Sequence, residues 1–279
     1  MIDIRSCSGF DELEACVQLQ IETWGYDETD VIPRKAFLVA QKIGGQVLGA
    51  FDSSLPALPH SLVGFAISLP GVKTGADGVA HPYLHSHMLA VREAYRNCGL
   101  GARLKREQRL EALSRGIRLM EWTFDPLEIK NAYLNIHRLG AVARRYLVDF
   151  YGASSSRLQG GLPTDRLVAE WYLDSPWVEA ILDGRPQDRG CGGAIELRIS
   201  VPAAIYELKS SDTGRDRARA IQLENRGKFQ EAFSQGLIVS GFARDAQGSG
   251  IFELGPEPAA LKDQRLQWFS PKPERLETR

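Results

Sequence analysis

A phosphate-binding turn is the chemistry that this chain indicates most directly. Arg96, Gly99 and Gly101 form an Arg-x-x-Gly-x-Gly pattern between an apolar run and a segment with helical periodicity. Glycines let the backbone approach a pyrophosphate closely, and the free N–H groups at the start of a helix point toward such an anion. Arg103 would add a second positive charge beside Arg96. The spacing therefore predicts a strand, a phosphate-cradling turn and a helix within residues 83–116.

Other phosphate-binding motifs do not fit this turn. It is not a Walker loop, because no Gly-Lys-Ser/Thr follows it, and it lacks the Gly-x-Gly-x-x-Gly fingerprint of dinucleotide-binding proteins. A short Gly-x-Gly also occurs in turns that bind no ligand. The strand before the turn and the helix after it favour the binding interpretation over that alternative.

Titratable side chains lie near the turn in the sequence. His85 and His87 alternate on one face of the strand predicted over residues 83–92, where either would act as a general base near neutral pH. Two solvated imidazoles at a polar strand end, or a metal pair without an evident third ligand, are the alternatives. Glu121, in the strand predicted over 119–124, is either a base acting through water or an outward-facing solvated carboxylate.

Hydrophobic periodicity and turn residues predict the elements that position these groups. The predicted strands cover residues 2–5, 46–51, 62–70, 83–92, 119–124, 143–151 and 167–173. The predicted helices cover residues 9–24, 34–42, 100–115 and 127–139. Read in order, the first part of the chain is therefore a strand, two helices, a hairpin, a strand, a glycine turn and a helix.

The turn and this order of elements resemble a known family. Arg-x-x-Gly-x-Gly, placed after a strand that ends in Leu89-Ala90-Val91 and before a helix, resembles motif A of the GNAT acyltransferase superfamily. The resemblance covers residues 1–175. It implies an α+β fold with a mixed sheet and an acyl-CoA N-acyltransferase activity. It also implies acetyl-CoA or another acyl-CoA as the co-substrate, without a metal.

The same resemblance implies which residues hold the co-substrate. In GNAT proteins the strand before the glycine turn splays from the next strand, and its free backbone groups hold the pantetheine arm. Residues 125–140 are similar to the segment in which an Asn contacts that arm. The implied contacts, made mainly by main-chain N–H groups in the strand and turn, are Leu89, Ala90, Val91, Arg96, Asn97, Cys98, Gly99, Leu100, Gly101 and Ala102, with Asn131 and Asn135 on the later helix.

The implied reaction is direct acyl transfer, in which a neutral amine attacks a thioester. It requires a base for the amine, a donor for the oxyanion and a proton source for the leaving thiolate. The candidates for catalytic roles are His87, Glu121, Tyr133 and His137. GNAT enzymes often place a Tyr general acid on the helix that holds Tyr133 and His137. Neither residue stands at the expected distance from Gly140.

Two further features concern the turn and the acceptor. Cys98 stands where the family often has a basic or small residue, and it is either a nucleophile activated by the helix N-terminus or an inert loop thiol. Glu22 lies near the end of the first predicted helix, which usually walls the acceptor pocket in this family. The aromatic residues that would line an apolar pocket, or else pack in the core, are Trp24, Tyr26, Trp122 and Phe124.

Composition limits the class of protein. The chain has 279 residues, of which 43% are hydrophobic and 25% are charged, and its net charge is −1. These values are typical of a soluble globular protein and do not favour a nucleic-acid partner, which usually selects a basic surface. No apolar run is long enough for a membrane span, the N-terminus lacks a signal-peptide pattern, and the four cysteines are scattered. We therefore expect a cytoplasmic protein with reduced thiols.

The C-terminal part of the chain is predicted to hold a linker and a second, smaller unit. Residues 176–193 are rich in Gly, Pro and Asp, as linkers often are. Residues 194–279 would contain a strand over 195–201, a helix over 216–235 and a hairpin over 237–254. Such a unit buries little surface by itself. We therefore expect it to dock on the first domain or on the partner subunit of a homodimer.

Functions from two classes follow from these observations. The first is an acyl-CoA-dependent N-acyltransferase that acts on a small amine-bearing acceptor. The alternative is a GNAT-fold module that binds CoA, or keeps only the fold, without turnover. The lack of a well-placed Tyr and of an obvious carboxylate base motivates this alternative. The chain does not identify the acceptor or the length of the acyl group.

Overall fold

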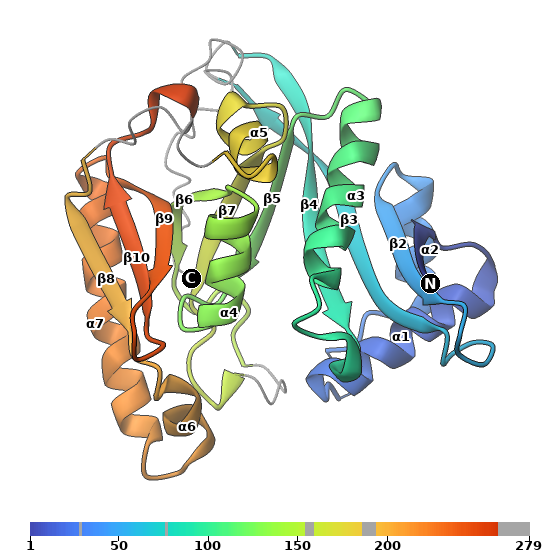
Figure 1. The fold of residues 1–279 in the computed structure, drawn as a ribbon, viewed down its shortest axis with the longest axis horizontal. Helices are drawn as coiled ribbons and strands as arrows, with labels where there is room; N and C mark the ends of the chain where they lie inside the picture. The colour runs from blue at the N-terminus through green and yellow to red at the C-terminus, as the bar shows by residue number, and fades with distance from the viewer. Residues whose placement is uncertain (28–29, 76–77, 154–158, 186–193, 262–279) are drawn as a thin grey trace.

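A computed structural model shows a mixed β-sheet with helices on both faces (Figure 1). It describes residues 1–27, 30–75, 78–153, 159–185 and 194–261. The strands follow the order β1-β2-β3-β4-β5-β7-β6-β9-β10-β8 across one sheet. Their bounds are β1 Ile2–Ser6, β2 Gln46–Asp52, β3 Leu62–Thr74, β4 Ala80–Val91, β5 Leu119–Phe124, β6 Val142–Leu147, β7 Arg166–Tyr172, β8 Leu197–Val201, β9 Ile238–Arg244 and β10 Gly250–Gly255. The predicted α+β class with a mixed sheet is confirmed.

The helices agree with the predicted ones in the N-terminal part of the chain. Their bounds are α1 Gly9–Trp24, α2 Arg34–Lys42, α3 Leu100–Ser114, α4 Ile129–Ala132, α5 Pro176–Leu182, α6 Ile205–Ser210 and α7 Arg215–Ser234. Short 3₁₀ turns are η1 Glu93–Tyr95 and η5 Ala259–Leu261, and a π-helical stretch η2 spans Tyr133–Arg138. Among the described helices, none combines the length and the apolar character that crossing a membrane requires.

The alternation of side chains along β3 explains how helices come to cover both faces. Successive residues of a strand point to opposite faces of the sheet. Phe65 and Ile67 pack in a hydrophobic cluster with residues of α1 and α2. Ala66 packs in a separate cluster with Leu104 of α3. α1 and α2 therefore cover one face of the N-terminal half of the sheet, and α3 covers the other (Figure 1).

The centre of the sheet is forked between β4 and β5. Within the described residues, the parallel pairing of these strands is confined to Leu84↔Met120 and His85↔Glu121. Beyond these pairs the strands part (Figure 1), while β4 stays paired with β3 as far as Val91↔Gly64. The splayed strands that the family resemblance implied are thus present. We call this opening the fork, and its apex is the point where the pairing ends.

The C-terminal elements extend the same sheet. β9 pairs with β6 at Ala143↔Val239, and β10 and β8 follow it to the edge. Phe229 of α7 stacks on Tyr146 of β6, with ring centroids 5.7 Å apart. The C-terminal unit therefore packs on the preceding part of the chain through both strand pairing and core contacts. Its status as a separate domain stays a prediction.

The segment predicted to be a linker, residues 176–193, begins with a helix. Ser175 caps α5, because its Oγ accepts a hydrogen bond from the N–H of Val178 at 3.2 Å. Trp177 and Val178 are both buried against the sheet. The Ser-Pro pair that resembled a linker is therefore a helix start, with Pro at the first helical position. Residues 186–193 lie outside the described residues.

Several other boundaries differ from the prediction. The helix predicted over 127–139 is divided into α4 and the wider π-helical η2. The strand predicted over 143–151 ends with β6 at Leu147, because Asp149 has a positive φ of 45°, which ends an extended strand. Helix α6 was not predicted from the sequence.

Candidate functional site

The glycine turn is exposed and leads directly into α3. Asn97 and Gly99 have φ values of 61° and 80°, and the side chains of residues 96–98 are exposed. A Cβ built on Gly99 would meet no atom within 4 Å, and one built on Gly101 would be in ordinary contact with Leu89 at 3.6 Å and Leu134 at 3.8 Å. The turn is therefore open on its outer side. By helix geometry, the first amides of α3 have no partner inside the helix, so they can bind an anion there.

The charged and thiol side chains of the turn are held by backbone groups. Arg96 Nε donates to the carbonyl oxygen of Val91 at 3.0 Å, which places its guanidinium over the end of β4. Arg103 Nη2 donates to the carbonyl oxygen of Ile2 at 3.0 Å, so this arginine is turned toward β1. Cys98 is exposed, and its thiol lies 3.4 Å from the carbonyl oxygen of Arg96. Arg96 therefore flanks the turn as expected, whereas Arg103 points away from it.

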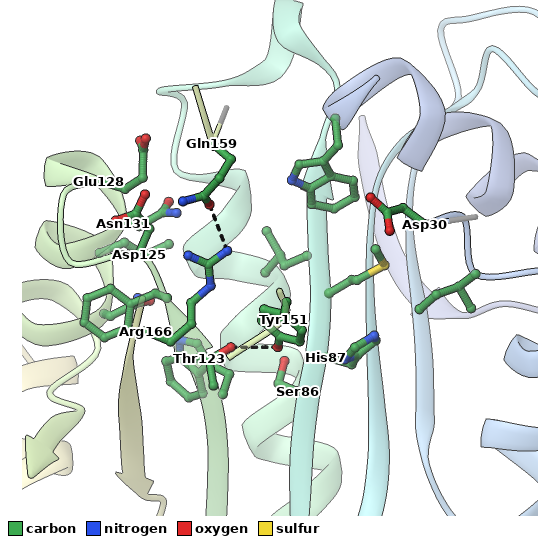
Figure 2. Close-up of a pocket in the computed structure, with 18 of the residues that line it drawn as sticks. Asp30, Ser86, His87, Thr123, Asp125, Glu128, Asn131, Tyr151, Gln159 and Arg166 are labelled. Carbon is green, nitrogen blue, oxygen red and sulfur yellow. Dashed lines mark hydrogen bonds between the residues drawn. The ribbon is translucent and has the colours of Figure 1, made fainter. Parts of the chain in front are cut away.

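A cavity of about 380 Å³ occupies the fork (Figure 2). It lies between the parted ends of β4 and β5 and is lined by segments from both halves of the chain. The described residues that line it are Trp24, Tyr26, Asp30, Ile32, Ser86, His87, Met88, Leu89, Lys105, Trp122, Thr123, Phe124, Asp125, Glu128, Asn131, Leu134, Asn135, Tyr151, Ala153, Gln159 and Arg166.

The backbone of β4 offers hydrogen-bonding groups to this cavity. The amide of Arg92 donates to the carbonyl oxygen of Val63 on β3 at 2.9 Å. Because backbone hydrogen bonds alternate between the two sides of a strand, the amides of Leu89 and Val91 face the fork. These are two of the three residues that we predicted would hold a pantetheine arm through main-chain groups.

The helix after β5 supplies the opposite wall. Asn131 and Asn135, the two predicted contacts of the pantetheine arm, both line the cavity. Figure 2 shows Asn131 on the same side as Asp125 and Glu128, facing His87 across the cavity. The predicted placement of this helix beside the fork therefore agrees with the structure.

Tyr133 and His137 lie on a different face of that helix. Their rings stack with centroids 4.6 Å apart, and the guanidinium of Arg244 lies 5.0 Å from the Tyr133 ring. The described lining of the cavity includes neither residue. Residues four apart share one helix face. Asn131 and Asn135 therefore reach the cavity together, whereas Tyr133 and His137 together face β9. The geometry gives no support to a catalytic role for Tyr133 or His137.

His87 is the predicted base that the structure places in the cavity. In the pairing of β3 with β4, Ile67 faces Met88 and Ser68 faces Ser86, so His87 is the extra residue of a β-bulge. Burial lowers the pKa of His87 below its usual value. The imidazole is therefore neutral near pH 7 and is able to accept a proton.

His85 lies next to His87 but outside the described lining. Their ring centroids are 6.1 Å apart. Burial, together with the nearby charges of His87, Lys105, Lys73 and Arg145, lowers the pKa of His85 to about 4. Of the two histidines that we considered as bases, the cavity selects His87.

Glu121 is held in a buried ion-pair network instead of facing the cavity. Its Oε1 lies 2.5 Å from Lys73 Nζ and 2.7 Å from Arg145 Nη2. Arg145 Nε also lies 3.2 Å from Glu170 Oε1. The solvated or water-linked carboxylate that we expected is therefore a paired one. Its carboxylate therefore contacts Lys73 and Arg145, and it is absent from the described lining of the cavity.

The four aromatic residues that were expected either to line an apolar pocket or to pack in the core line the cavity, and Trp122 and Phe124 also belong to the core. Trp24 and Tyr26 stack with centroids 5.5 Å apart and an interplanar angle of 15°. The segment after them is fixed by Gln20, whose side chain donates to the carbonyl oxygen of Ile32 at 2.8 Å and accepts from its amide at 2.9 Å. Trp122 and Phe124 line the cavity too, so all four aromatic residues contribute to it. Glu22 pairs with Arg92 at 3.5 Å, outside the described lining.

Several lining residues escaped the sequence-based interpretation. Tyr151 reaches over β5, and its hydroxyl lies 2.8 Å from Thr123 Oγ1 (Figure 2). Arg166 donates from Nη2 to Gln159 Oε1 at 3.1 Å and lies 5.4 Å from the Tyr151 ring. These residues come from loops and strand ends far apart in the sequence, and no local pattern marks them. Lys105 did carry a signal, since it stands beside the apolar stripe of its helix.

The described residues contain no group of three His, Cys, Asp or Glu side chains arranged to hold a metal ion. The charged groups that line the cavity include Lys105, Asp125 and Arg166. The site therefore combines an exposed glycine turn, strand amides that face the fork and a cavity that holds a neutral imidazole.

Comparison with known proteins finds similar solved structures at low sequence identity. No protein-family model and no curated protein sequence matches the chain. Its structure is similar to Arabidopsis thaliana NAA60 in complex with acetyl-CoA, at 18% identity and a TM-score of 0.48, over 62% of this chain and 99% of that one. It is also similar to the ribosomal-protein-S18-alanine N-acetyltransferase from Escherichia coli, at 16% identity and a TM-score of 0.46, over 62% of this chain and 94% of that one.

A third similar structure is a GNAT family acetyltransferase from Elizabethkingia anophelis with acetyl-CoA bound. It shares 13% identity and a TM-score of 0.44, over 61% of this chain and 97% of that one. At these identities and TM-scores the likeness assigns no residue role and no substrate to this chain.

Proposed function

We propose that this protein is a GNAT-type N-acyltransferase that moves an acyl group from an acyl-CoA directly to a small amine. The observation that carries the proposal is the fork, because the path from the exposed glycine turn along β4 leads to the cavity that Leu89, Met88 and His87 line. A diphosphate on the turn, an extended arm along β4 and a thioester in the cavity would occupy that path in the order of the CoA molecule.

The turn and β4 would hold the co-substrate mainly through backbone groups. The amides of residues 98–102 would bind the diphosphate, with Arg96 beside them. Leu89 and Val91 would donate their fork-facing amides to the pantetheine arm. Asn131 and Asn135 would contact the same arm from the opposite wall. Backbone donors suit this task because their positions are fixed by the strand before the ligand arrives.

His87 would act as the base that keeps the attacking amine neutral. The amine nitrogen forms a bond to the thioester carbonyl carbon, and its proton passes to the imidazole. A strand amide near the bulge would stabilise the oxyanion. As the C–S bond breaks, the thiolate takes a proton, for which the Tyr151 hydroxyl is the donor in the cavity. The pKa of His87 suits its role, since its lowered value keeps the imidazole unprotonated at neutral pH.

The size of the cavity supports a small acceptor. Its volume of about 380 Å³ is shared by the acyl group and the acceptor. Trp24 and Tyr26 would pack on the apolar part of that acceptor. Arg166 donates to the neutral side-chain amide of Gln159, and the described ion pairs do not include it. It is therefore placed to meet an acceptor carboxylate.

The second candidate function is a CoA-binding module without turnover. The pairing of Glu121 with two cations and the position of Tyr133 and His137 on another helix face favour it. The two candidates share the same binding path and differ in chemistry. Release of free thiol from acetyl-CoA in the presence of amines therefore separates them.

Calorimetric binding of CoA tests the shared part of both functions. Gly101→Leu adds a side chain at the proposed diphosphate turn, directed toward Leu89 and Leu134, and should weaken CoA binding by about tenfold or more, which corresponds to about 1.4 kcal/mol. Gly227→Leu is the matched control, because Gly227 lies inside α7 and a Cβ there would meet nothing within 4 Å. Each variant also replaces a helical glycine and gains helix propensity.

The binding experiments can contradict the proposal in two ways. No measurable affinity of the unmodified protein for CoA or any acyl-CoA would remove the proposal. Equal affinities of Gly101→Leu and Gly227→Leu would remove the turn as the diphosphate site. For the acceptor, thiol release with small amines but not with peptides would support the small-acceptor part, and the reverse would contradict it.

A further inference from the structure

A lysine lies at the apex of the fork. Lys105 projects from α3, and its side chain is only 4% exposed. Its Nζ donates to Ser86 Oγ at 2.7 Å and lies 3.7 Å from the centroid of the Trp122 ring. Ser86 and Trp122 directly follow His85 and Glu121, the last residues that pair β4 with β5. The amine therefore sits where the strands begin to part, and it lines the cavity there.

This lysine has no acidic partner in the described part of the chain. The described ion pairs do not include it, and its one hydrogen-bond acceptor, Ser86 Oγ, also interacts with Gln108 Oε1 at 3.1 Å. An ammonium group offers three donors, and a hydroxyl with a ring face satisfies only part of them. Burial accordingly lowers the pKa of Lys105 well below its usual value.

A buried lysine at this position is expected to destabilise the folded protein, so its presence there points to a function. The buried stripe of α3 is otherwise formed by Leu100, Leu104, Gln108 and Ala112. Methionine has nearly the same length as lysine and would pack beside Trp122 without an amine to desolvate. Residues that break the local rule of a buried stripe are expected at functional sites. Lys105 lines the cavity, in the space beyond the expected thioester. Its function would therefore concern the group that is bound there.

We propose that Lys105 recognises an acyl group that ends in a carboxylate, so that the acyl donor is the CoA thioester of a dicarboxylic acid. This inference rests on the proposed function and adds the class of its donor. An arm that runs along β4 from the turn delivers the thioester beside Met88 and His87. The rest of the acyl chain then points toward the apex, where its carboxylate meets the Lys105 amine and the Ser86 hydroxyl.

The recognition would be selective for a physical reason. A carboxylate supplies the counter-charge that the buried amine lacks, and the desolvated site strengthens their attraction. An uncharged acyl group of the same length would leave the amine without that partner, and sites with buried polar groups discriminate strongly against ligands that leave them unpaired. The fork would thus favour a charged acyl chain over an aliphatic one.

The test compares succinyl-CoA with butyryl-CoA, in which a methyl group replaces the terminal carboxylate. Their dissociation constants are measured by calorimetry, together with those of acetyl-CoA and free CoA. The unmodified protein should bind succinyl-CoA at least about tenfold more tightly than butyryl-CoA. Lys105→Met should remove this preference or reverse it. Lys130→Met is the matched control, because it deletes the charge of an exposed lysine near the cavity and should keep the preference.

Each result decides the matter. Equal binding of succinyl-CoA and butyryl-CoA by the unmodified protein, or an unchanged preference in Lys105→Met, would overturn the inference while CoA binding upholds the proposed function. A lack of binding by free CoA and all three thioesters would overturn both. A thermal melt shows whether Lys105→Met is folded, and unaltered free CoA binding by that variant confirms that its turn is intact.

Discussion

Two buried lysines show how differently the two halves of this molecule use charge. Lys105 at the fork and Lys209 on α6 are 4% and 5% exposed. Lys209 Nζ lies 3.1 Å from Asp125 Oδ2 and 2.8 Å from Glu128 Oε1, whereas Lys105 Nζ has a hydroxyl and a ring face. Burial lowers the pKa of both, but the two carboxylates more than offset it at Lys209, whose pKa is raised. Lys209 is therefore a structural cation, whereas Lys105 is a buried amine that lacks an acidic partner in the described part of the chain.

The surroundings of each lysine follow the same division. In the C-terminal half, Arg226 of α7 makes two contacts with the buried Asp165, at 2.9 and 3.0 Å. Arg145 likewise joins Glu121 and Glu170. These charges are paired within the protein. The pairs made by Lys209 and Arg226 hold α6 and α7 against the preceding part of the chain. The fork instead presents groups with spare hydrogen-bonding capacity to a cavity, which is the arrangement expected of a binding site.

The largest effect that this contrast predicts is at Lys209. Lys209→Met would leave Asp125 and Glu128 buried without their cation, and breaking a buried pair in this way costs about 3–5 kcal/mol. Urea denaturation should show that loss in the free energy of unfolding. A triple variant that also carries Asp125→Asn and Glu128→Gln should recover part of it. A loss below about 1 kcal/mol would mean that Lys209 is as dispensable for stability as a surface lysine.

The next effect concerns turnover. His87→Gln keeps a polar side chain at the bulge but removes the base, and it should slow thiol release by about a hundredfold or more. Because burial lowers the pKa of His87, the rate of the unmodified enzyme should fall on acidification only below the usual histidine pKa of about 6.5. His60→Gln, at an exposed position, is the control. Equal rates for His87→Gln and His60→Gln would argue for the module without turnover.

A third, smaller effect reverses the sign seen at Lys209. Lys105→Met should raise the free energy of unfolding by about 1–3 kcal/mol at neutral pH, since it removes an incompletely satisfied buried group. The lowered pKa of Lys105 means that the unfolded chain binds a proton that the folded protein does not. Stability of the unmodified protein should therefore rise with pH, by up to about 1.4 kcal/mol per unit, between the lowered pKa and the usual lysine value.

The measurement is urea denaturation of both proteins across that pH range. The advantage of Lys105→Met should be largest on the acidic side and should shrink as the pH approaches the ordinary lysine pKa of about 10.4. A variant that is less stable than the unmodified protein at every pH would place Lys105 with Lys209 as a structural cation.

These contrasts also explain which parts of the site were readable from the sequence. The turn and the end of β4 lie close together in the chain, so Arg96, Gly99 and Leu89 could be placed by spacing alone. Lys105 and Glu121 could not be assigned, because their roles depend on partners in other elements. From its place in the sequence, Glu121 could be a catalytic carboxylate. Its ion pairs with Lys73 and Arg145 are visible only in the structure.

Helix geometry accounts for another part of what was missed. Tyr133 and His137 were plausible catalytic residues on an ideal helix, but the π-helical stretch η2 and its contact with Arg244 set their rings toward β9. The wall formed by Tyr151 and Arg166 is assembled by loops whose course no local pattern predicts. Local motifs were therefore sufficient to predict the turn and the end of β4. The wall formed by Tyr151 and Arg166 depends on long-range packing.

The smallest predicted effect examines whether Ser86 holds Lys105 as the carboxylates hold Lys209. Ser86→Ala removes the hydroxyl that accepts from the Lys105 amine, and the loss of such a neutral partner should cost about 1 kcal/mol in the free energy of unfolding. Thr123→Val, which removes another cavity hydroxyl bonded to Tyr151, is the matched control and should cost about as much. The preference for succinyl-CoA should survive in Ser86→Ala, because the carboxylate is expected to pair with the amine itself. A loss in Ser86→Ala as large as that in Lys209→Met would instead show that one hydroxyl does for Lys105 what two carboxylates do for Lys209. In that case the contrast between a structural and a ligand-binding lysine would not hold.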